Sequence, residues 1–289
     1  MSRRTPGAAA LCAVALALTA CGGQAPTPSP PRTTAVTASA PRHHSAATHS
    51  RLRRDGWIGG HHARGVRVPI LMYHVMQAPP PGAPNRELFV SPERFAAQVA
   101  ALRRAGFTGV TMDEVLAGWR RGAPLPRRPI VVSFDDGYWS QYSNAAPVLR
   151  SVGWPGVLNL ELNDLRGKGS LKPTTIRKLL ANGWEIDSHT ISHPDLTQVD
   201  DARLRHELVD SRRRLRRMFG VRADVFCYPA GRFDARVVAA VRAAGYAVAT
   251  TELPGVATAQ SDPFTLPRVR VSGSDTAGSV LARVRALVR

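Results

Sequence analysis

Short apolar runs alternate with amphipathic segments of helical period from about residue 66 to the end of the chain. The runs are rich in Val, Ile, Leu and Phe, which is typical of strands buried on both faces. They occupy residues 66–76, 107–112, 130–134, 157–162, 225–228, 246–251 and 266–271, and another begins at residue 184. The helical segments occupy residues 92–105, 115–119, 145–152, 174–180, 200–219, 235–244 and 279–288. This alternation over short links predicts an α/β fold with a parallel sheet covered by helices, either open or closed into a barrel.

Several helix starts are marked by capping residues. Ser91 followed by Pro92 supplies an N-cap and a first-turn proline. Thr111 and Glu114 form a capping-box pattern. Thr174 or Thr175 is expected to cap the helix that runs to residue 180.

The segment PIVVSFDDG, residues 129–137, places two carboxylates at the end of a buried strand. Neighbouring side chains of a strand point to opposite faces, so a turn beginning at Gly137 is needed to bring Asp135 and Asp136 to one site. Two carboxylates brought close together repel each other and need a compensating cation. The alternative is that both acids merely open a loop and cap the next helix.

The segment WEIDSHTISHPDL, residues 184–196, carries His189 and His193 at the end of another strand. Two imidazoles four residues apart share one face if the segment turns helically, and two imidazoles with a carboxylate form an ordinary ligand set for a first-row metal. Of the nine histidines, only His74, His189, His193 and His206 lie beyond residue 68. This pairing of histidines and acids at strand ends predicts a metal site.

SFDDG followed by SHTISHP resembles the first two motifs of the polysaccharide deacetylases, the NodB-like carbohydrate esterases of family 4. These enzymes remove N-acetyl groups from amino-sugar polymers. The resemblance implies a distorted, incomplete parallel (β/α) barrel over residues 66–289, with active residues at the carboxyl ends of strands. It also implies that Asp136, His189 and His193 hold one divalent ion and that Asp135 is the general base. The ligand set suits Zn²⁺, and also Co²⁺ or Ni²⁺.

The third motif departs from the family pattern. The family has Arg-x-Pro-Tyr, whereas this chain has Cys-Tyr-Pro-Ala at residues 227–230. Tyr228 and Ala230 are therefore the residues expected at the substrate and oxyanion position, where the main-chain N–H of Ala230 can stabilise negative charge. The lost arginine leaves open what orients Asp135, for which Arg268 and Arg270 are candidates.

A histidine near the end of the family domain usually protonates the leaving amine, but no histidine follows His206. The opening segment PILMYHVM, residues 69–76, resembles the first strand of the circularly permuted poly-N-acetylglucosamine deacetylases. On that resemblance His74 is the general acid. The alternative is a structural histidine near a strand end.

The first 65 residues have the features of an export signal and a tether. Arg3 and Arg4 precede an apolar run and the sequence Leu-Thr-Ala-Cys, which resembles a bacterial lipobox. We therefore expect a lipoprotein signal peptide at 1–20, a lipid anchor on Cys21 and an extracytoplasmic protein bound to the cell membrane. A plain secretory signal is the alternative. Residues 21–65 are rich in Pro, Thr, Ser, His and Arg, which predicts a disordered tether.

The formal charge of +18 favours anionic partners, among them envelope polymers, phospholipid headgroups and nucleic acid. The sequence has no nucleic-acid motif, and the arginine-rich segment 212–217 is expected to be a solvated helix face. Cys227 is the only thiol beyond the predicted signal and anchor, and we expect it to be buried and inert. We expect a monomer.

Together these features predict a metal-dependent hydrolase that removes N-acetyl groups from an N-acetylhexosamine polymer. The main rival is a catalytically inactive carbohydrate-binding protein of the same fold, because the third-motif Arg and Tyr are missing. A metal-dependent phosphoesterase would be expected to add carboxylates for a second ion. A purely structural envelope tether would leave the Asp and His constellation unexplained.

Overall fold

The computed structural model describes residues 57–289. The expected signal peptide, Cys21 and the tether up to residue 56 lie outside the described residues.

The first described residues belong to the folded unit. Strand β1 (Trp57–Ile58) pairs antiparallel with β4 (Leu125–Pro126), and the short helix α2 (His61–Arg64) follows. Ile58 packs against the hydrophobic core and Ala63 is fully buried. The expectation that the tether reaches residue 65 is therefore wrong for residues 57–65, because their few apolar side chains find a partner surface.

Seven parallel strands pair in a closed ring. They are β2 (Ile70–Tyr73), β5 (Pro129–Asp136), β6 (Val157–Leu160), β7 (Glu185–Ser188), β8 (Val225–Cys227), β9 (Val248–Pro254) and β10 (Leu266–Arg270). The first of these, β2, pairs with both β10 and β5, and this double pairing closes the ring. A short strand β3 (Thr108–Gly109) pairs with β5 from outside the ring. A complete barrel of this type has eight strands, so the expected incomplete parallel β/α barrel is confirmed.

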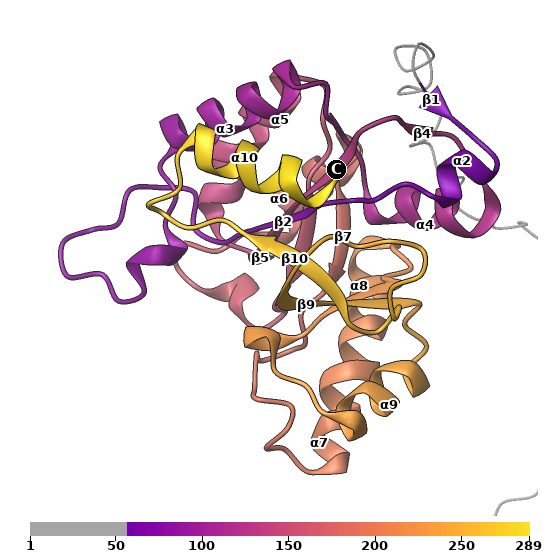
Figure 1. Cartoon of the computed structure of the whole chain (residues 1–289). Helices are drawn as coiled ribbons and strands as arrows, with labels where there is room; N and C mark the ends of the chain where they lie inside the picture. The colour runs from indigo at the N-terminus through magenta and orange to yellow at the C-terminus, as the bar shows by residue number, and fades with distance from the viewer. Residues whose placement is uncertain (1–56) are drawn as a thin grey trace, which may run out of the picture. The chain divides into compact units, whose positions relative to one another are not determined.

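Helices surround the strands, as Figure 1 shows. They are α3 (Pro92–Arg104), α4 (Met112–Arg121), α5 (Ala146–Ser151), α6 (Pro173–Ala181), α7 (Asp201–Arg205), α8 (Ser211–Phe219), α9 (Ala235–Ala243) and α10 (Ala277–Leu287). Two π-helical segments, η2 (Gln141–Ala145) and η4 (His206–Asp210), precede α5 and α8, and three short 3₁₀ turns are η1 (Arg86–Leu88), η3 (Asp164–Arg166) and η5 (Pro229–Gly231). The predicted helix over residues 200–219 is thus one run, α7–η4–α8, with a π-helical middle.

The predicted caps are mostly confirmed. The Ser91 side chain accepts a hydrogen bond from the Arg94 N–H at the start of α3, and α4 begins with the complete Thr111–Glu114 capping box. The cap expected from Thr174 or Thr175 is wrong, because α6 begins at Pro173 with Lys172 at the N-cap, so both threonines lie within its first turn.

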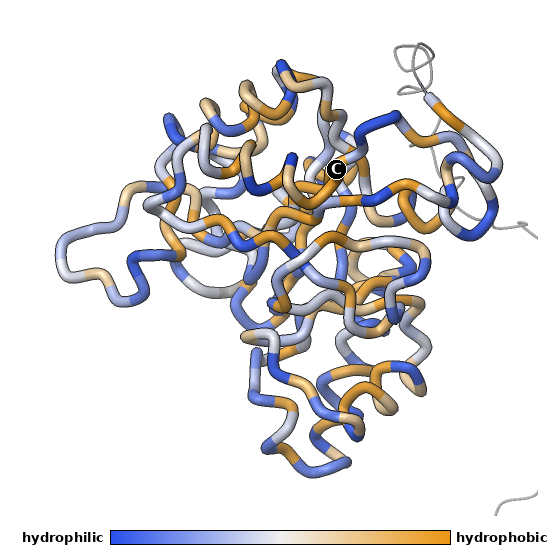
Figure 2. The backbone as a smooth tube through the Cα atoms, in the orientation of Figure 1, coloured by the Kyte–Doolittle hydropathy of each residue, from blue (hydrophilic) through white to orange (hydrophobic). Residues whose placement is uncertain are grey.

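Alternation along the strands decides which side chains enter the ring. Ile130, Val132 and Phe134 of β5 pack in the cluster beneath the surrounding helices, so the intervening positions, up to Asp135, face the interior. Apolar residues from different strands form a second cluster at the amino-terminal end of the interior: Ile70, Val131, Val157, Val225, Val248 and Leu266. Figure 2 shows the hydrophobic strands at the centre and polar residues on the outer turns. The polar interior positions are consequently gathered at the carboxyl ends of the strands.

Among the described residues, no helix is both long enough and apolar enough to cross a membrane.

Candidate active site

Asp135 is held in a fixed orientation at the end of β5. Its carboxylate is 1% exposed and accepts two hydrogen bonds from Arg268 of β10, from Nη1 to Oδ1 at 2.9 Å and from Nη2 to Oδ2 at 2.8 Å. Asn159 of β6 donates from Nδ2 to Oδ1 at 2.7 Å. Arg268 is itself buried and donates from Nε to the Thr251 carbonyl at 2.8 Å. The planar guanidinium fork fits the carboxylate, so the side chain of Asp135 has little freedom to rotate.

The surroundings keep Asp135 ionised. Burial alone would raise the pKa of Asp135, but the charge of Arg268, then that of His74, and the hydrogen bonds from Arg268 outweigh it and hold this pKa well below its usual range. Gln141 supports the same region, because its Nε2 donates to the main-chain carbonyls of Asp135 at 2.6 Å and His74 at 2.9 Å.

Asp136 is aimed by a tight turn in the main chain. Its φ of 74° lies in the left-handed region, and the Gly137 N–H donates to the Asp135 carbonyl at 3.0 Å, which is the i to i+2 bond of a γ-turn. The turn is therefore centred on Asp136, the last residue of β5, one residue earlier than expected. It redirects a carboxylate that strand alternation would otherwise send toward the helices.

Asp136, His189 and His193 form a compact cluster of ligand atoms. The Oδ1 atom of Asp136 lies 3.5 Å from Nε2 of His189 and 3.7 Å from Nε2 of His193, and all three ligand atoms lie within 4.8 Å of one another. The Nδ1 atom of His189 lies 2.8 Å from the Cys227 carbonyl, which acts as an acceptor and leaves Nε2 free to coordinate. The donor set and its tautomer therefore fit a divalent cation.

The loop that carries both histidines does not turn helically, which was the condition stated for placing the two imidazoles on one face. Thr190 and His193 have φ values of 71° and 52°, so two left-handed residues, rather than one helical turn, bring the imidazoles together. Their ring centroids lie 4.8 Å apart.

A second group of ligand-type atoms comprises Asp135, His189 and Cys227. Both oxygens of Asp135 are bonded to Arg268, whose positive charge disfavours a cation at that place. Asp136, in contrast, faces two imidazoles. The donor set of Asp136 is thus the one suited to a metal ion.

His74, at the end of β2, lies beside the fixed carboxylate. Its Nε2 is 3.8 Å from Oδ2 of Asp135, and the residue is 9% exposed. Burial lowers the pKa of His74, although Asp135 and Asp136 act in the opposite direction. The first strand of the barrel thus brings a titratable group to the site, as the permuted arrangement requires.

The two third-motif residues expected at the substrate position, Tyr228 and Ala230, lie in different environments. Tyr228 is buried among the aromatic side chains of Phe226 and Phe233, and its hydroxyl donates to the Phe264 carbonyl at 3.1 Å. Strand alternation explains this, because the residue after Cys227 faces the helices. The hydroxyl of Tyr228 is therefore hydrogen-bonded within the core and does not face the site.

Ala230 lies in η5 at the end of β8, is exposed, and has a φ of 50°. Cys227 is a fully buried free thiol, as expected, with its Sγ 3.8 Å from Oδ2 of Asp135. Of the two candidate arginines, Arg268 orients Asp135, whereas Arg270 pairs with Glu252 at 2.6 Å.

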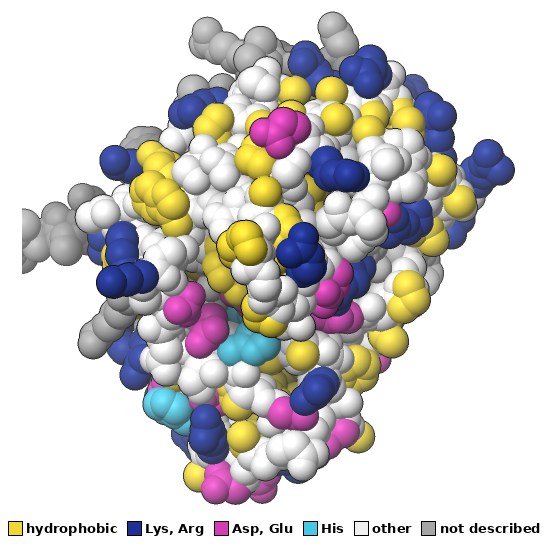
Figure 3. Space-filling model, turned by 90° about the vertical axis from the view of Figure 1, so that its left-hand side faces the viewer, with side chains coloured by type: hydrophobic (Ala, Val, Ile, Leu, Met, Phe, Trp, Pro, Cys, Tyr) yellow, Lys and Arg dark blue, Asp and Glu magenta, His cyan; other side chains and the backbone are white. Residues whose placement is uncertain are grey.

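Sequence reasoning missed Asn159, Gln141 and Glu161. Glu161 follows β6, and burial together with Asp164 and Asp136 raises its pKa to about 7. The alternation of apolar and polar residues in the strand VLNLE was the available signal, because it places residues 159 and 161 on the interior face. On the surface shown in Figure 3, a histidine lies among acidic side chains, while Lys and Arg are spread over the rest of the face.

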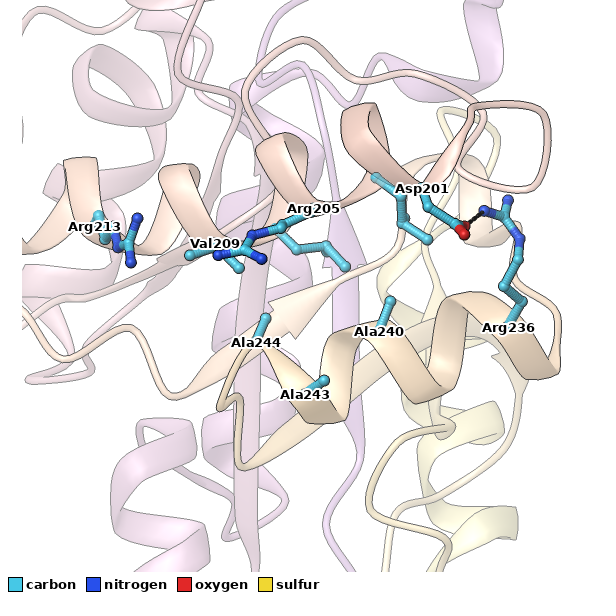
Figure 4. Close-up of a pocket in the computed structure, with 10 residues that line it drawn as sticks. Asp201, Arg205, Val209, Arg213, Arg236, Ala240, Ala243 and Ala244 are labelled. Atoms are coloured by element: carbon cyan, nitrogen blue, oxygen red, sulfur yellow. Dashed lines mark hydrogen bonds and ion pairs between the residues drawn. The ribbon is translucent and has the colours of Figure 1, made fainter.

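A pocket lies between α7–α8 and α9, and none of the candidate active-site residues lines it (Figure 4). Its floor is apolar and includes Val209, Ala240 and Ala244, while Arg205 and Arg213 lie on its edge. Arg236 at one end pairs with Asp201 at 2.8 Å.

The chain is similar to several known polysaccharide deacetylases. The polysaccharide deacetylase family model matches residues 122–249. The chain is 28% identical over 207 residues to YxkH of Bacillus subtilis (strain 168), whose name describes a polysaccharide deacetylase, and the match covers 72% of each protein. It is 23% identical over 201 residues to the poly-beta-1,6-N-acetyl-D-glucosamine N-deacetylase of Staphylococcus aureus (strain MRSA252), covering 63% of this chain and 68% of that protein.

Among solved structures, the deacetylase PplD of Streptococcus pyogenes, in complex with acetate, has the same fold. Its TM-score is 0.70 at 24% identity, over 76% of this chain and 99% of that chain. A closed ring of parallel strands with acids and histidines at the carboxyl ends defines a β/α-barrel protein with its site at that end. Residues 122–249, which match the polysaccharide deacetylase family model, include Asp135, Asp136, His189 and His193.

Proposed function

We propose that this protein hydrolyses the N-acetyl groups of an N-acetylhexosamine polymer, with one divalent cation held by Asp136, His189 and His193. The observation that carries the proposal is the pairing of two adjacent carboxylates in different environments. Asp135 is clamped by a buried guanidinium, whereas Asp136 faces two imidazole nitrogens. One acid is thus fitted to act on protons and the other to coordinate.

When bound, the cation supplies Lewis acidity toward the acetyl carbonyl and the attacking water. Asp135, ionised and fixed in orientation, accepts a proton from that water as it adds to the carbonyl carbon. The main-chain N–H of Ala230 stabilises the negative charge on the carbonyl oxygen. The C–N bond then breaks, and His74 donates a proton to the departing nitrogen. The products are acetate and a free amine on the sugar.

The position of His74 suits proton donation. Because burial lowers its pKa, its protonated form gives up the proton readily, and Asp135 at 3.8 Å favours that protonated form. An imidazole far from any carboxylate would not have its protonated form stabilised in this way.

The rival proposal of an inactive carbohydrate-binding protein rested on the lost third-motif Arg and Tyr. Arg268 supplies a buried guanidinium to Asp135 from another strand, so the function of that arginine is present. We therefore favour an enzyme. The similarity to a poly-beta-1,6-N-acetyl-D-glucosamine N-deacetylase makes that polymer the first substrate to test.

The test is acetate release from poly-β-1,6-N-acetylglucosamine, chitin oligomers and peptidoglycan, with and without a chelator. We expect release from at least one polymer, its loss with chelator and its recovery when Zn²⁺ or Co²⁺ is added back. Binding of a polymer without acetate release under every metal condition would contradict the proposal and support the binding protein.

We further propose that the protein is a lipoprotein attached through Cys21 to the outer face of the bacterial cell membrane. The support is the lipobox-like sequence that ends at this cysteine.

A further inference from the structure

The loop between β7 and α7 carries two of the proposed metal ligands in a strained backbone. Thr190 and His193 are two of the six described residues other than glycine that have a positive φ. This conformation is disfavoured for residues with a Cβ and persists only where neighbouring groups hold it. The placement of both imidazoles therefore depends on what fixes the loop.

Glu207 is one of the groups that hold it, together with the hydrogen bonds from the Asn163 N–H to the Ile191 carbonyl at 2.8 Å and from the His193 N–H to Oγ1 of Thr190 at 2.9 Å. Its carboxylate is 2% exposed, and Oε2 accepts hydrogen bonds from the main-chain N–H groups of Ile191 at 2.8 Å and Ser192 at 3.0 Å. Oε1 accepts from the Ser192 hydroxyl at 2.6 Å. Both carboxylate oxygens are thus bonded to the two residues that lie between Thr190 and His193.

Glu207 reaches the loop from the π-helical segment η4. Its neighbour Leu208 packs in the hydrophobic cluster beneath α9, so the segment uses one side for the core and another for the loop. A π-helical turn inside a longer helix is often found at functional sites. Arg203 adds little, because its side chain is 56% exposed and its Nε is 3.9 Å from Oε1.

We propose that Glu207 is a positioning residue for the metal site, which holds the loop so that Nε2 of His189 and of His193 both face Asp136. This inference rests on the proposed function for the identity of the ligands. It adds a residue that neither the sequence motifs nor the ligand cluster contains. Loss of such an outer group typically weakens metal binding about 10- to 100-fold.

The test compares Glu207→Ala and Glu207→Gln with Asp210→Ala. Asp210 is an acid of the same π-helical segment, but its side chain is 40% exposed and bonds to His206, away from the loop. Zn²⁺ affinity is measured by competition with a chromophoric chelator, and the absorption spectrum of the Co²⁺-loaded protein reports ligand geometry. Amide hydrogen exchange at residues 191 and 192 is measured in metal-free protein.

We expect Glu207→Ala to weaken Zn²⁺ binding at least tenfold, to change the Co²⁺ spectrum and to speed exchange at both amides. Glu207→Gln keeps one carbonyl oxygen as an acceptor, so its Zn²⁺ affinity and amide exchange are expected to lie between those of the wild type and Glu207→Ala. It should fold even if the alanine variant does not. Asp210→Ala should match the wild type. Wild-type affinity and exchange in both Glu207 variants would overturn the inference. If the wild-type chain bound no metal, the proposed function would fail, while the exchange in metal-free protein would still decide whether Glu207 holds the loop.

Discussion

Replacing Arg268 by methionine removes the group that orients Asp135 and leaves a buried carboxylate without its cation. The side chains of Arg268 and Asp135 are 1% and 2% exposed, and the pair is joined by two hydrogen bonds of normal length. Removing one partner of such a buried pair costs about 3–5 kcal/mol. A domain of ordinary stability has about 5–15 kcal/mol in total, so Arg268→Met should remain folded but be markedly less stable.

The pH dependence distinguishes a lost ion pair from lost packing. In the wild type the pKa of Asp135 is depressed, so its contribution to stability is present above the unfolded pKa of about 3.9 and is lost as the pH falls toward the lower folded pKa. In Arg268→Met, burial without the guanidinium raises the pKa of Asp135 above the unfolded value, so stability declines as the pH rises. The destabilisation by Arg268→Met should therefore grow between pH 4 and pH 8.

The assay is urea unfolding of the metal-free protein at several pH values, with Arg270→Met as the matched control. Arg270 lies two residues along the same strand, and its pair with Glu252 is partly exposed, so its loss should cost less than about 1 kcal/mol at every pH. Equal and pH-independent losses in the two variants would refute the account of the Asp135–Arg268 pair.

The remaining predictions concern the proton donor, a half-buried acid and the anchor. His74→Ala should keep metal and fold but lower kcat on polymer about 100-fold or more, with a smaller loss on activated aryl acetates, and equal losses would argue against proton donation. Burial, with nearby acids, raises the pKa of Glu185 from its usual 4.5 to about 8, so the folded state retains a proton that the unfolded state loses. Stability should thus fall as pH rises from about 4.5 to 8 and Glu185→Gln should flatten this slope in thermal melts, an effect whose absence would show that Glu185 is not perturbed. Cys21→Ser should move the protein from the membrane to the soluble fraction of cells, and unchanged retention would point to another anchor.

Local sequence pattern was enough for the seven strands of the ring, most helices and the residues at strand ends, but not for β1, β4 or α2. Apolar runs and capping residues act over a few positions, so the buried strand before Asp135 and the cap at Thr111 are visible in the sequence. Long-range pairing is different, because Arg268 lies 133 residues from Asp135 and meets it only once β2, β5 and β10 close the ring. Motif comparison left Arg268 and Arg270 equal, since both occupy one strand.

Backbone conformation was the other feature that pattern could not supply. The left-handed turn at Asp136 and the two in the histidine loop belong to residues that usually avoid this region, and they are fixed by tertiary contacts. The same holds for Glu207, whose role depends on hydrogen bonds to main-chain groups of another element. The orientation of Tyr228 toward the helices rather than the site, by contrast, follows from strand alternation and could have been predicted from the sequence.

The most direct test of the central claim compares wild type and Asp135→Asn in metal content and acetate release from an N-acetylglucosamine polymer. Asp135→Asn removes the proposed base but none of the proposed ligands. We therefore expect wild-type metal content and a rate of acetate release at least about 100-fold lower. Acetate release by Asp135→Asn at the wild-type rate, with equal metal content, would contradict the assignment of Asp135 as the base and with it the proposed division of roles between the two adjacent carboxylates.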